Sequence, residues 1–247
     1  MSLFLKYALL PPELPDPDRT QFPFTIPALR TFRRMDFTAP VTILIGENGI
    51  GKSTLLEAIA VSYGFSAEGG SLNHQFRTKD THSPLHELLF CNLYPKPKYG
   101  FFLRAESLYN FFSFEDQLVA ETGRPGIFSR MHRFSHGESF MEVMGRLPKQ
   151  GLYLMDEPEA ALSPSRQLQF LVRLHEHVLA NGSQFVICTH SPILMAYPGA
   201  DLHEITEEGI RPVEYDETDH VRLTRDFLKA PGAFLKRLLR NQTADEI

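Results

Sequence analysis

A glycine-rich segment that ends in a lysine and two hydroxyl side chains is the clearest chemical feature of this sequence. Residues 46–54 read Gly-Glu-Asn-Gly-Ile-Gly-Lys-Ser-Thr, which fits the pattern Gly-x-x-x-x-Gly-Lys-Ser/Thr without a mismatch. Glycines let a loop wrap a chain of phosphates so that successive backbone N–H groups point inward. The segment therefore predicts a phosphate-binding loop.

The side chains at the end of this loop have distinct expected tasks. We expect Lys52 to reach the β- and γ-phosphates of ATP and the Ser53 hydroxyl to bind Mg²⁺. Thr54 would contact a further phosphate oxygen. The rest of the predicted ATP site is the loop itself, formed by Glu47, Asn48, Gly49, Ile50 and Gly51.

Two adjacent carboxylates, Asp156 and Glu157, follow the apolar run at residues 152–155. A buried parallel strand delivers the side chains at its carboxyl end to the edge where α/β sheets bind ligands. We expect Asp156 to hold Mg²⁺, directly or through water, and Glu157 to polarise the attacking water as a general base. An acidic turn would explain the pair by itself, but the phosphate-binding loop upstream favours the catalytic interpretation.

His190 follows the next buried apolar run, residues 185–188. An imidazole there can donate a hydrogen bond to a phosphate oxygen and so sense whether that phosphate is present. Because the chain has ten histidines, a structural role is the default for each of them. The place of His190 at the end of a buried strand favours the catalytic role.

The order of these features resembles that of the ABC-type ATPases, and in particular the soluble predicted AAA-family ATPases of the RecF and SMC-like branch. Residues 156–164, Asp-Glu-Pro-Glu-Ala-Ala-Leu-Ser-Pro, are similar to the acidic strand end and D-loop of that class. The resemblance runs from about residue 40 to the C-terminus and implies that His190 contacts the γ-phosphate. Ser163 stands where transporters usually have aspartate, and as a helix N-cap before Pro164 it also fits a structural role.

Ser135 and Gly137 lie in a segment, residues 134–139, that resembles the ABC signature Leu-Ser-Gly-Gly-Gln. The resemblance implies that this turn contacts the γ-phosphate of ATP held by a second subunit. It therefore implies a homodimer that sandwiches two ATP molecules. An ordinary N-cap turn would contain the same residues, but their place between the phosphate-binding loop and the acidic strand favours the signature.

Two parts of the family pattern lack a clear counterpart. Glu106, at the end of a predicted strand, is the candidate Q-loop residue and a further Mg²⁺ ligand, with Gln75 as the alternative. Phe24 and Phe32 are candidate adenine contacts that fit a hydrophobic core equally well.

The elements that position these residues alternate between buried strands and helices, which predicts an α/β fold. More specifically, we expect a P-loop NTPase with a parallel-sheet ABC-ATPase core, a small helical lobe and an antiparallel β edge. The expected strands are residues 41–45, 99–107, 152–155 and 185–188, with a hairpin over 202–215 and a strand after the glycine pair at 69–70. The expected helices are residues 53–64, 139–147 and 164–180, short helices from 108 to about 133, a short helix after 190, and two helices between about 218 and 240.

We expect a single domain over residues 1–247. It divides into a RecA-like core at about 36–106 and 148–216, a helical lobe at about 107–147 and C-terminal helices at about 217–241. The N-terminal residues fit a surface or edge strand better than a signal sequence, and residues 11–27 read as a proline-rich loop.

Composition limits the classes of protein that fit. Hydrophobic residues make up 43% of the chain, enough for a core, and the net charge of −5 gives no general signal for nucleic acid. No stretch approaches the run of about 20 apolar residues that a membrane span needs. Two cysteines far apart in sequence favour a reducing compartment, so we expect a soluble cytoplasmic protein.

Three functions fit these features. The first is a free-standing ATPase head without coiled-coil arms, because the chain between Thr54 and Ser135 lacks a sustained heptad pattern. The second is the nucleotide-binding subunit of a membrane transporter. The third is an ATP-gated dimerisation switch for an unknown protein or DNA partner.

Overall fold

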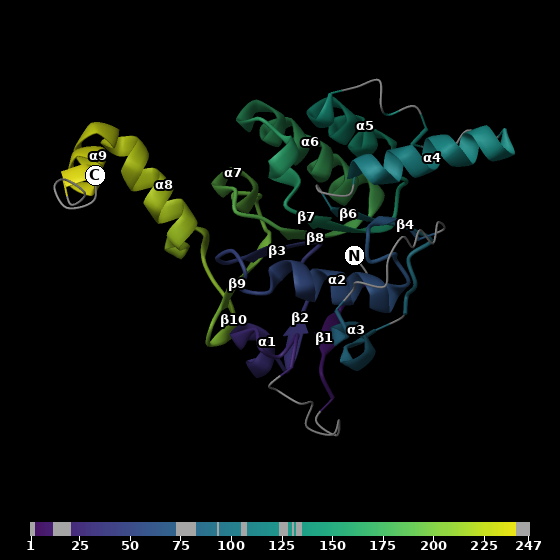
Figure 1. The fold of residues 1–247 in the computed structure, drawn as a ribbon, viewed down its shortest axis with the longest axis horizontal. Helices are drawn as coiled ribbons and strands as arrows, with labels where there is room; N and C mark the ends of the chain where they lie inside the picture. Colours follow the sequence, from purple (N-terminus) through teal and green to yellow (C-terminus); the bar gives the residue numbers. More distant parts are fainter. Residues whose placement is uncertain are drawn as a thin grey trace.

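A seven-stranded sheet forms the centre of the computed structural model, which describes residues 3–11, 21–72, 83–92, 94–104, 108–123, 128–129, 131 and 135–240. The strand order is β10-β9-β3-β8-β7-β6-β4 (Figure 1). The run from β9 to β6 is parallel, whereas β10 and β4 pair antiparallel with β9 and β6. The predicted α/β fold with an antiparallel edge is confirmed. The strands are β3 Val41–Ile45, β4 Gly70–Ser71, β6 Tyr99–Arg104, β7 Gly151–Asp156, β8 Gln184–Cys188, β9 Asp201–Thr206 and β10 Gly209–Pro212.

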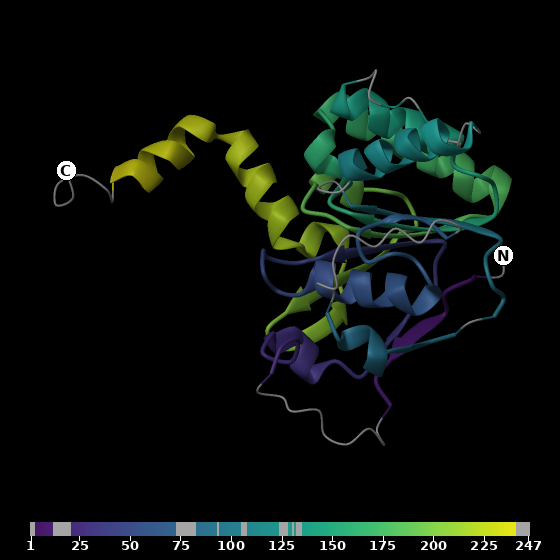
Figure 2. The same cartoon turned by 45° about the vertical axis from the view of Figure 1, so that its right-hand side comes forward.

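Helices cover both faces of this sheet (Figures 1 and 2). One face carries α4 Leu108–Thr122, α5 His136–Arg146 and α6 Pro164–Asn181, with α7 Pro192–Met195 beyond β8. The other face carries α1 Pro27–Thr31, α2 Lys52–Tyr63 and α3 Leu85–Leu88. The last two helices, α8 Asp219–Lys229 and α9 Pro231–Arg240, project away from the body of the molecule (Figure 2).

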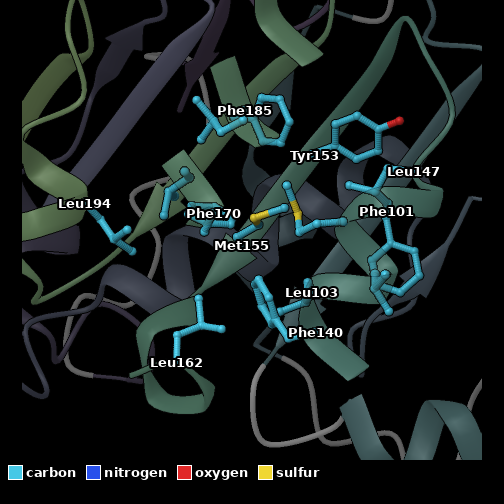
Figure 3. Close-up of a cluster of buried hydrophobic side chains, with 14 of the residues drawn as sticks. Phe101, Leu103, Phe140, Leu147, Tyr153, Met155, Leu162, Phe170, Phe185 and Leu194 are labelled. Carbon is cyan, nitrogen blue, oxygen red and sulfur yellow. The ribbon is translucent and has the colours of Figure 1, made fainter. Parts of the chain in front are cut away.

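The central strands are buried on both faces, which explains why they read as continuous apolar runs. Alternate residues of β7 enter two separate hydrophobic clusters. Tyr153 and Met155 point toward α5 and α6, where Phe140 and Phe170 meet edge to face at 5.7 Å (Figure 3). Leu152 and Leu154 pack on the opposite side of the sheet, in the cluster that contains residues of α2. Because successive side chains of a strand point to opposite faces, the same strand packs against the helices on both sides of the sheet.

A second, three-stranded antiparallel sheet lies beside α2, and the sequence did not predict it. Its order is β2-β1-β5, with β1 Tyr7–Leu9, β2 Arg34–Asp36 and β5 Phe90–Cys91. The strand expected near the N-terminus is confirmed as β1, but it is the central strand of this sheet and not an edge strand, because β1 pairs on both sides. Its partners are only two and three residues long, so neither shows a recognisable alternation of apolar and polar residues.

Local capping explains the other differences from the predicted boundaries. The helix expected to begin at residue 139 begins at His136, because Ser135 and Glu138 form a capping box at its N-terminus. The short helices expected after residue 108 are one 15-residue helix, α4, which ends before Gly123 with a φ of +66°. The strand expected over 99–107 is described as far as Arg104, and most of the stretch after the glycine pair lies outside the described residues.

The C-terminal predictions are confirmed. The hairpin is formed by β9 and β10, and two helices follow it after a 3₁₀ turn at Tyr215–Glu217. Within the described part of the chain, no helix is long and apolar enough to cross a membrane.

Candidate nucleotide-binding site

The phosphate-binding loop joins β3 to α2, as predicted, and its glycines are required by its geometry. Gly46 has a φ of +148°, and a Cβ there would lie 2.4 Å from the Ile205 carbonyl oxygen. Gly51 caps α2 at a φ of +109°, with Ile26 Cγ2 3.0 Å from the place of a Cβ. A side chain at either position would strain the backbone and push the loop away from β9 or α1.

Lys52 is held inside this loop. Its ammonium donates hydrogen bonds to the carbonyl oxygens of Gly46 at 2.8 Å and Glu47 at 3.0 Å, and only 4% of the residue is exposed. Burial lowers the pKa of Lys52, while the carboxylates of Asp156 and Glu157 partly oppose that shift. The side chain thus fixes the curvature of the loop and places positive charge where phosphates would lie.

The two residues expected to bind Mg²⁺ meet at the carboxyl edge of the sheet. Ser53 Oγ donates to Asp156 Oδ1 at 2.9 Å across 103 residues of sequence. Mg²⁺ usually takes one or two protein ligands, with waters and phosphate oxygens completing its octahedron. A hydroxyl and a carboxylate in contact fit that ion, and the described residues contain no cluster of three or more acidic, histidine or cysteine ligands.

Arg104, at the end of β6, is a site residue that sequence reasoning missed. Its Nη1 lies 2.7 Å from Glu57 Oε2 on α2, and its Nε lies 3.8 Å from Asp156 Oδ2. The guanidinium therefore orients Asp156 from the side opposite Ser53. Its position at the carboxyl end of a parallel strand could have indicated this role. The predicted ligand Glu106 and its alternative Gln75 lie outside the described residues.

Glu157 stands in the left-handed region, with φ 49° and ψ 53°. Its N–H donates to the Cys188 carbonyl at 3.0 Å, which ties the end of β7 to the end of β8. This conformation is unfavourable for a residue with a side chain, and the Glu157 side chain is 43% exposed. The carboxylate is thus accessible to water beside the phosphate-binding loop.

His190 faces Glu157 from the end of β8. Its Nε2 lies 3.5 Å from Glu157 Oε1 and makes no hydrogen bond among the described residues. The backbone N–H of His190 donates to Glu159 Oε1 at 2.6 Å. On the imidazole ring, Nδ1 lies 3.0 Å from His220 Nε2. Burial, followed by the charge of Lys52, lowers the pKa of His190, which favours the neutral imidazole.

A scan for known protein families gives one match. Residues 25–92 match the family model of an AAA domain, in the stretch that contains the phosphate-binding loop. None of the curated proteins matches the chain. The predicted resemblance to AAA-family ATPases is therefore confirmed by a match that includes the phosphate-binding loop but not residues 134–139 or 156–164.

Solved structures similar to the chain include ABC and SMC ATPase domains. The SMC head domain from Thermotoga maritima is 16% identical, with a TM-score of 0.46, over 86% of this chain and 100% of that chain. The cbiO1 protein from Clostridium perfringens, part of the ABC transporter complex cbiONQ, is 17% identical, with a TM-score of 0.46, over 85% and 91%.

The predicted signature residues lie at the start of α5, outside the AAA match. Ser135 is exposed, and its backbone N–H and Oγ both donate to Glu138 Oε2, at 3.0 and 2.7 Å. Gly137 fits tightly, since a Cβ there would lie 2.8 Å from the Ala161 carbonyl oxygen. Among the described residues no hydrogen bond joins Ser135 or Gly137 to the phosphate-binding loop of the same chain.

Three other candidates have structural surroundings in this protein. Phe24 and Phe32 are 4% and 3% exposed and belong to the hydrophobic cluster around α2, so the core alternative is the correct one. Ser163 is the N-cap of α6, with Pro164 as its first residue. The Ser163 hydroxyl makes no cap hydrogen bond and lies 3.2 Å from the Ser165 hydroxyl.

Two further residues of the site escaped the sequence reasoning. Glu159 follows Asp156 and Glu157 at the end of β7. That position near the carboxyl edge of the sheet could have indicated its contact with the backbone of His190. Burial raises the pKa of its carboxyl, which the hydrogen bond from the His190 N–H partly opposes. His220 lies on α8, with no local signal that places it beside His190.

Proposed function

We propose that this protein binds ATP with Mg²⁺ and hydrolyses it as a homodimer that sandwiches two ATP molecules. The single observation that carries the proposal is the Ser53–Asp156 hydrogen bond. It joins the phosphate-binding loop to the acidic strand end, next to Glu157 and His190. We also propose that the protein acts in the cytoplasm, because Cys91 and Cys188 are both free thiols.

The chain supplies each group that phosphoryl transfer to water needs. Lys52 and the loop N–H groups would bind the phosphates. Ser53 and Asp156 would hold Mg²⁺, which would supply positive charge beside the phosphates. Glu157 would accept a proton from the attacking water. At the same time the water oxygen bonds to the γ-phosphorus, and the bond between the γ-phosphorus and the β–γ bridging oxygen breaks, so that ADP leaves. The imidazole Nε2–H of His190 would donate to a γ-phosphate oxygen.

The dimer is supported by where the signature residues lie. Ser135 is exposed at the N-terminus of an 11-residue helix, where backbone N–H groups and the helix dipole favour an anion. Since no hydrogen bond joins Ser135 to the loop of its own chain, we assign it to the γ-phosphate held by the second copy.

The Glu157→Gln variant tests the base and the dimer together. We expect unchanged ATP affinity and a kcat lower by about 10²–10⁴, because a general base contributes that much. With hydrolysis blocked, size-exclusion chromatography in MgATP should give a dimer. A monomer under those conditions contradicts the sandwich, and wild-type turnover contradicts the role of Glu157.

Two further variants complete the design. Lys52→Ala should weaken ATP binding by roughly 10–150-fold, because hydrogen bonds to charged groups contribute about 1.5–3 kcal/mol. Undiminished binding would refute the phosphate-binding loop. Glu208→Gln, which changes an exposed glutamate in the turn between β9 and β10, should behave as the wild type.

A further inference from the structure

A second histidine contacts the candidate γ-phosphate sensor. His220 Nε2 lies 3.0 Å from His190 Nδ1, with the ring centroids 5.2 Å apart and the rings tilted by 48°. A hydrogen bond between two imidazole nitrogens requires one nitrogen with a proton and one with a lone pair. The pair therefore links the protonation of one ring to that of the other.

His220 is held in place although most of α8 projects from the molecule (Figure 1). Thr218 caps α8 from a fully buried position: its hydroxyl accepts from the Val221 N–H at 3.3 Å and donates to the Tyr215 carbonyl at 3.0 Å. Val221 itself is 3% exposed and belongs to the core cluster under α6. The first turn of α8 is thus fixed to the body of the protein.

His190 is fixed from the other side. Glu159 Oε1 accepts its backbone N–H at 2.6 Å, and its ring lies between His220 and Glu157. With both rings anchored by their backbones, the imidazole contact is a defined part of the site.

Two proton arrangements satisfy the pair, and Glu157 distinguishes them. If His220 donates, the His190 proton is on Nε2, where it faces the Glu157 carboxylate oxygen at 3.5 Å. If His190 donates instead, its Nε2 lone pair faces that negative oxygen, which is electrostatically unfavourable. The carboxylate therefore favours the arrangement in which His220 donates.

We infer that His220 is a positioning residue that donates to Nδ1 of His190 and so keeps the His190 proton on Nε2, aimed at the γ-phosphate. This inference rests on the proposed function only for the identity of the phosphate. The neutral state of His190 that it requires agrees with the lowered pKa of the buried ring. A carboxylate or carbonyl commonly orients a functional histidine through its second nitrogen, and here another imidazole takes that place.

Nitrogen NMR on nucleotide-free protein tests the tautomer directly. In ¹⁵N-histidine-labelled wild type we expect His190 to carry its proton on Nε2, with a hydrogen-bonded Nδ1. Its resonances are identified by their loss in His190→Gln. In His220→Phe, the ¹⁵N chemical shift of His190 Nδ1 should change to the value of a nitrogen without a hydrogen bond. A His190 ring protonated on Nδ1 in the wild type, or one unchanged in His220→Phe, overturns the inference.

Kinetics separate positioning from a structural role. His220→Phe should lower kcat about 10–100-fold at unchanged ATP affinity, the usual cost of losing a supporting hydrogen bond. His220→Gln, whose amide N–H can replace the ring donor, should restore kcat, and Asp219→Asn on the same exposed turn should have no effect. Equal kcat for His220→Phe and wild type overturns the role of His220. A wild type that hydrolyses no ATP refutes the proposed function, whereas the nitrogen resonances still decide the inference.

Discussion

Burial shifts the pKa of side chains well away from the candidate nucleotide-binding site as well as within it. His177 on α6 is 7% exposed, and its Nε2 lies 3.1 Å from the Met144 carbonyl. Burial lowers the pKa of His177, opposed by that hydrogen bond. Its Nδ1 makes no hydrogen bond among the described residues, so a second proton there would be a buried, unpaired donor.

This residue should make stability depend on pH. An unfolded histidine binds a proton near pH 6.5, whereas folded His177 binds one only at lower pH. As pH falls through about 6.5, the unfolded state therefore binds more protons, and the free energy of unfolding decreases. Between about pH 7 and pH 5, wild type should lose more stability in urea denaturation than His177→Gln does. Parallel losses in the two proteins would contradict this role.

At the scale of elements, the start of α5 is fitted tightly against the turn after β7. A Cβ at Gly137 would lie 2.4 Å from Arg166 Nη1 and 2.8 Å from the Ala161 carbonyl oxygen. The flexible arginine could move aside, but the carbonyl belongs to the turn that leads from Glu157 to α6. The close approach therefore links the signature segment to the acidic strand end.

Two glycines of α5 give a matched test of that contact. Gly137→Ala should lower the free energy of unfolding by about 1–3 kcal/mol, because the added methyl group forces the helix and the turn apart. A Cβ at Gly145 would have no neighbouring atom within 4 Å. Gly145→Ala should therefore stabilise the protein by about 0.5–1 kcal/mol, because alanine has the better helix propensity. Chemical denaturation measures both. Equal effects at the two positions would contradict the tight fit.

On the scale of the whole molecule, Gln184 in β8 links the N-terminal segment to the seven-stranded sheet through hydrogen bonds. Its Oε1 accepts from the Leu5 N–H at 2.8 Å, and its Nε2 donates to the Leu5 carbonyl at 2.7 Å, both buried. The side chain thus acts as a strand partner for Leu5 across 179 residues of sequence. It brings the small antiparallel sheet against the seven-stranded sheet.

Replacing this glutamine should leave two buried backbone groups without partners. Gln184→Leu should lower the free energy of unfolding by about 1–3 kcal/mol for each unpaired group, as read from denaturation curves. Gln169→Leu, on the exposed face of α6, should stay within about 0.5 kcal/mol of wild type. A loss in both variants, or in neither, would contradict the role of the Gln184 amide.

The sequence by itself determined the parts of this protein that depend on neighbours along the chain. The phosphate-binding loop needs glycines, a preceding buried strand and a following helix, and all three are contiguous in residues 41–64. Carboxyl ends of parallel strands share one sheet edge, so Ser53, Asp156, Glu157 and His190 could be placed together before any contact was known. The domain boundaries and the roles of these residues stay predictions.

Only the tertiary structure decided which side chains complete that edge. Arg104 reaches Asp156 from the neighbouring strand β6, and His220 reaches His190 from a helix that follows the whole sheet in sequence. No local periodicity encodes such contacts, because they depend on how separate elements pack. The second sheet was hidden for a related reason: strands of two or three residues are too short to show a pattern, and packing against α2 and the Gln184 amide holds them in place.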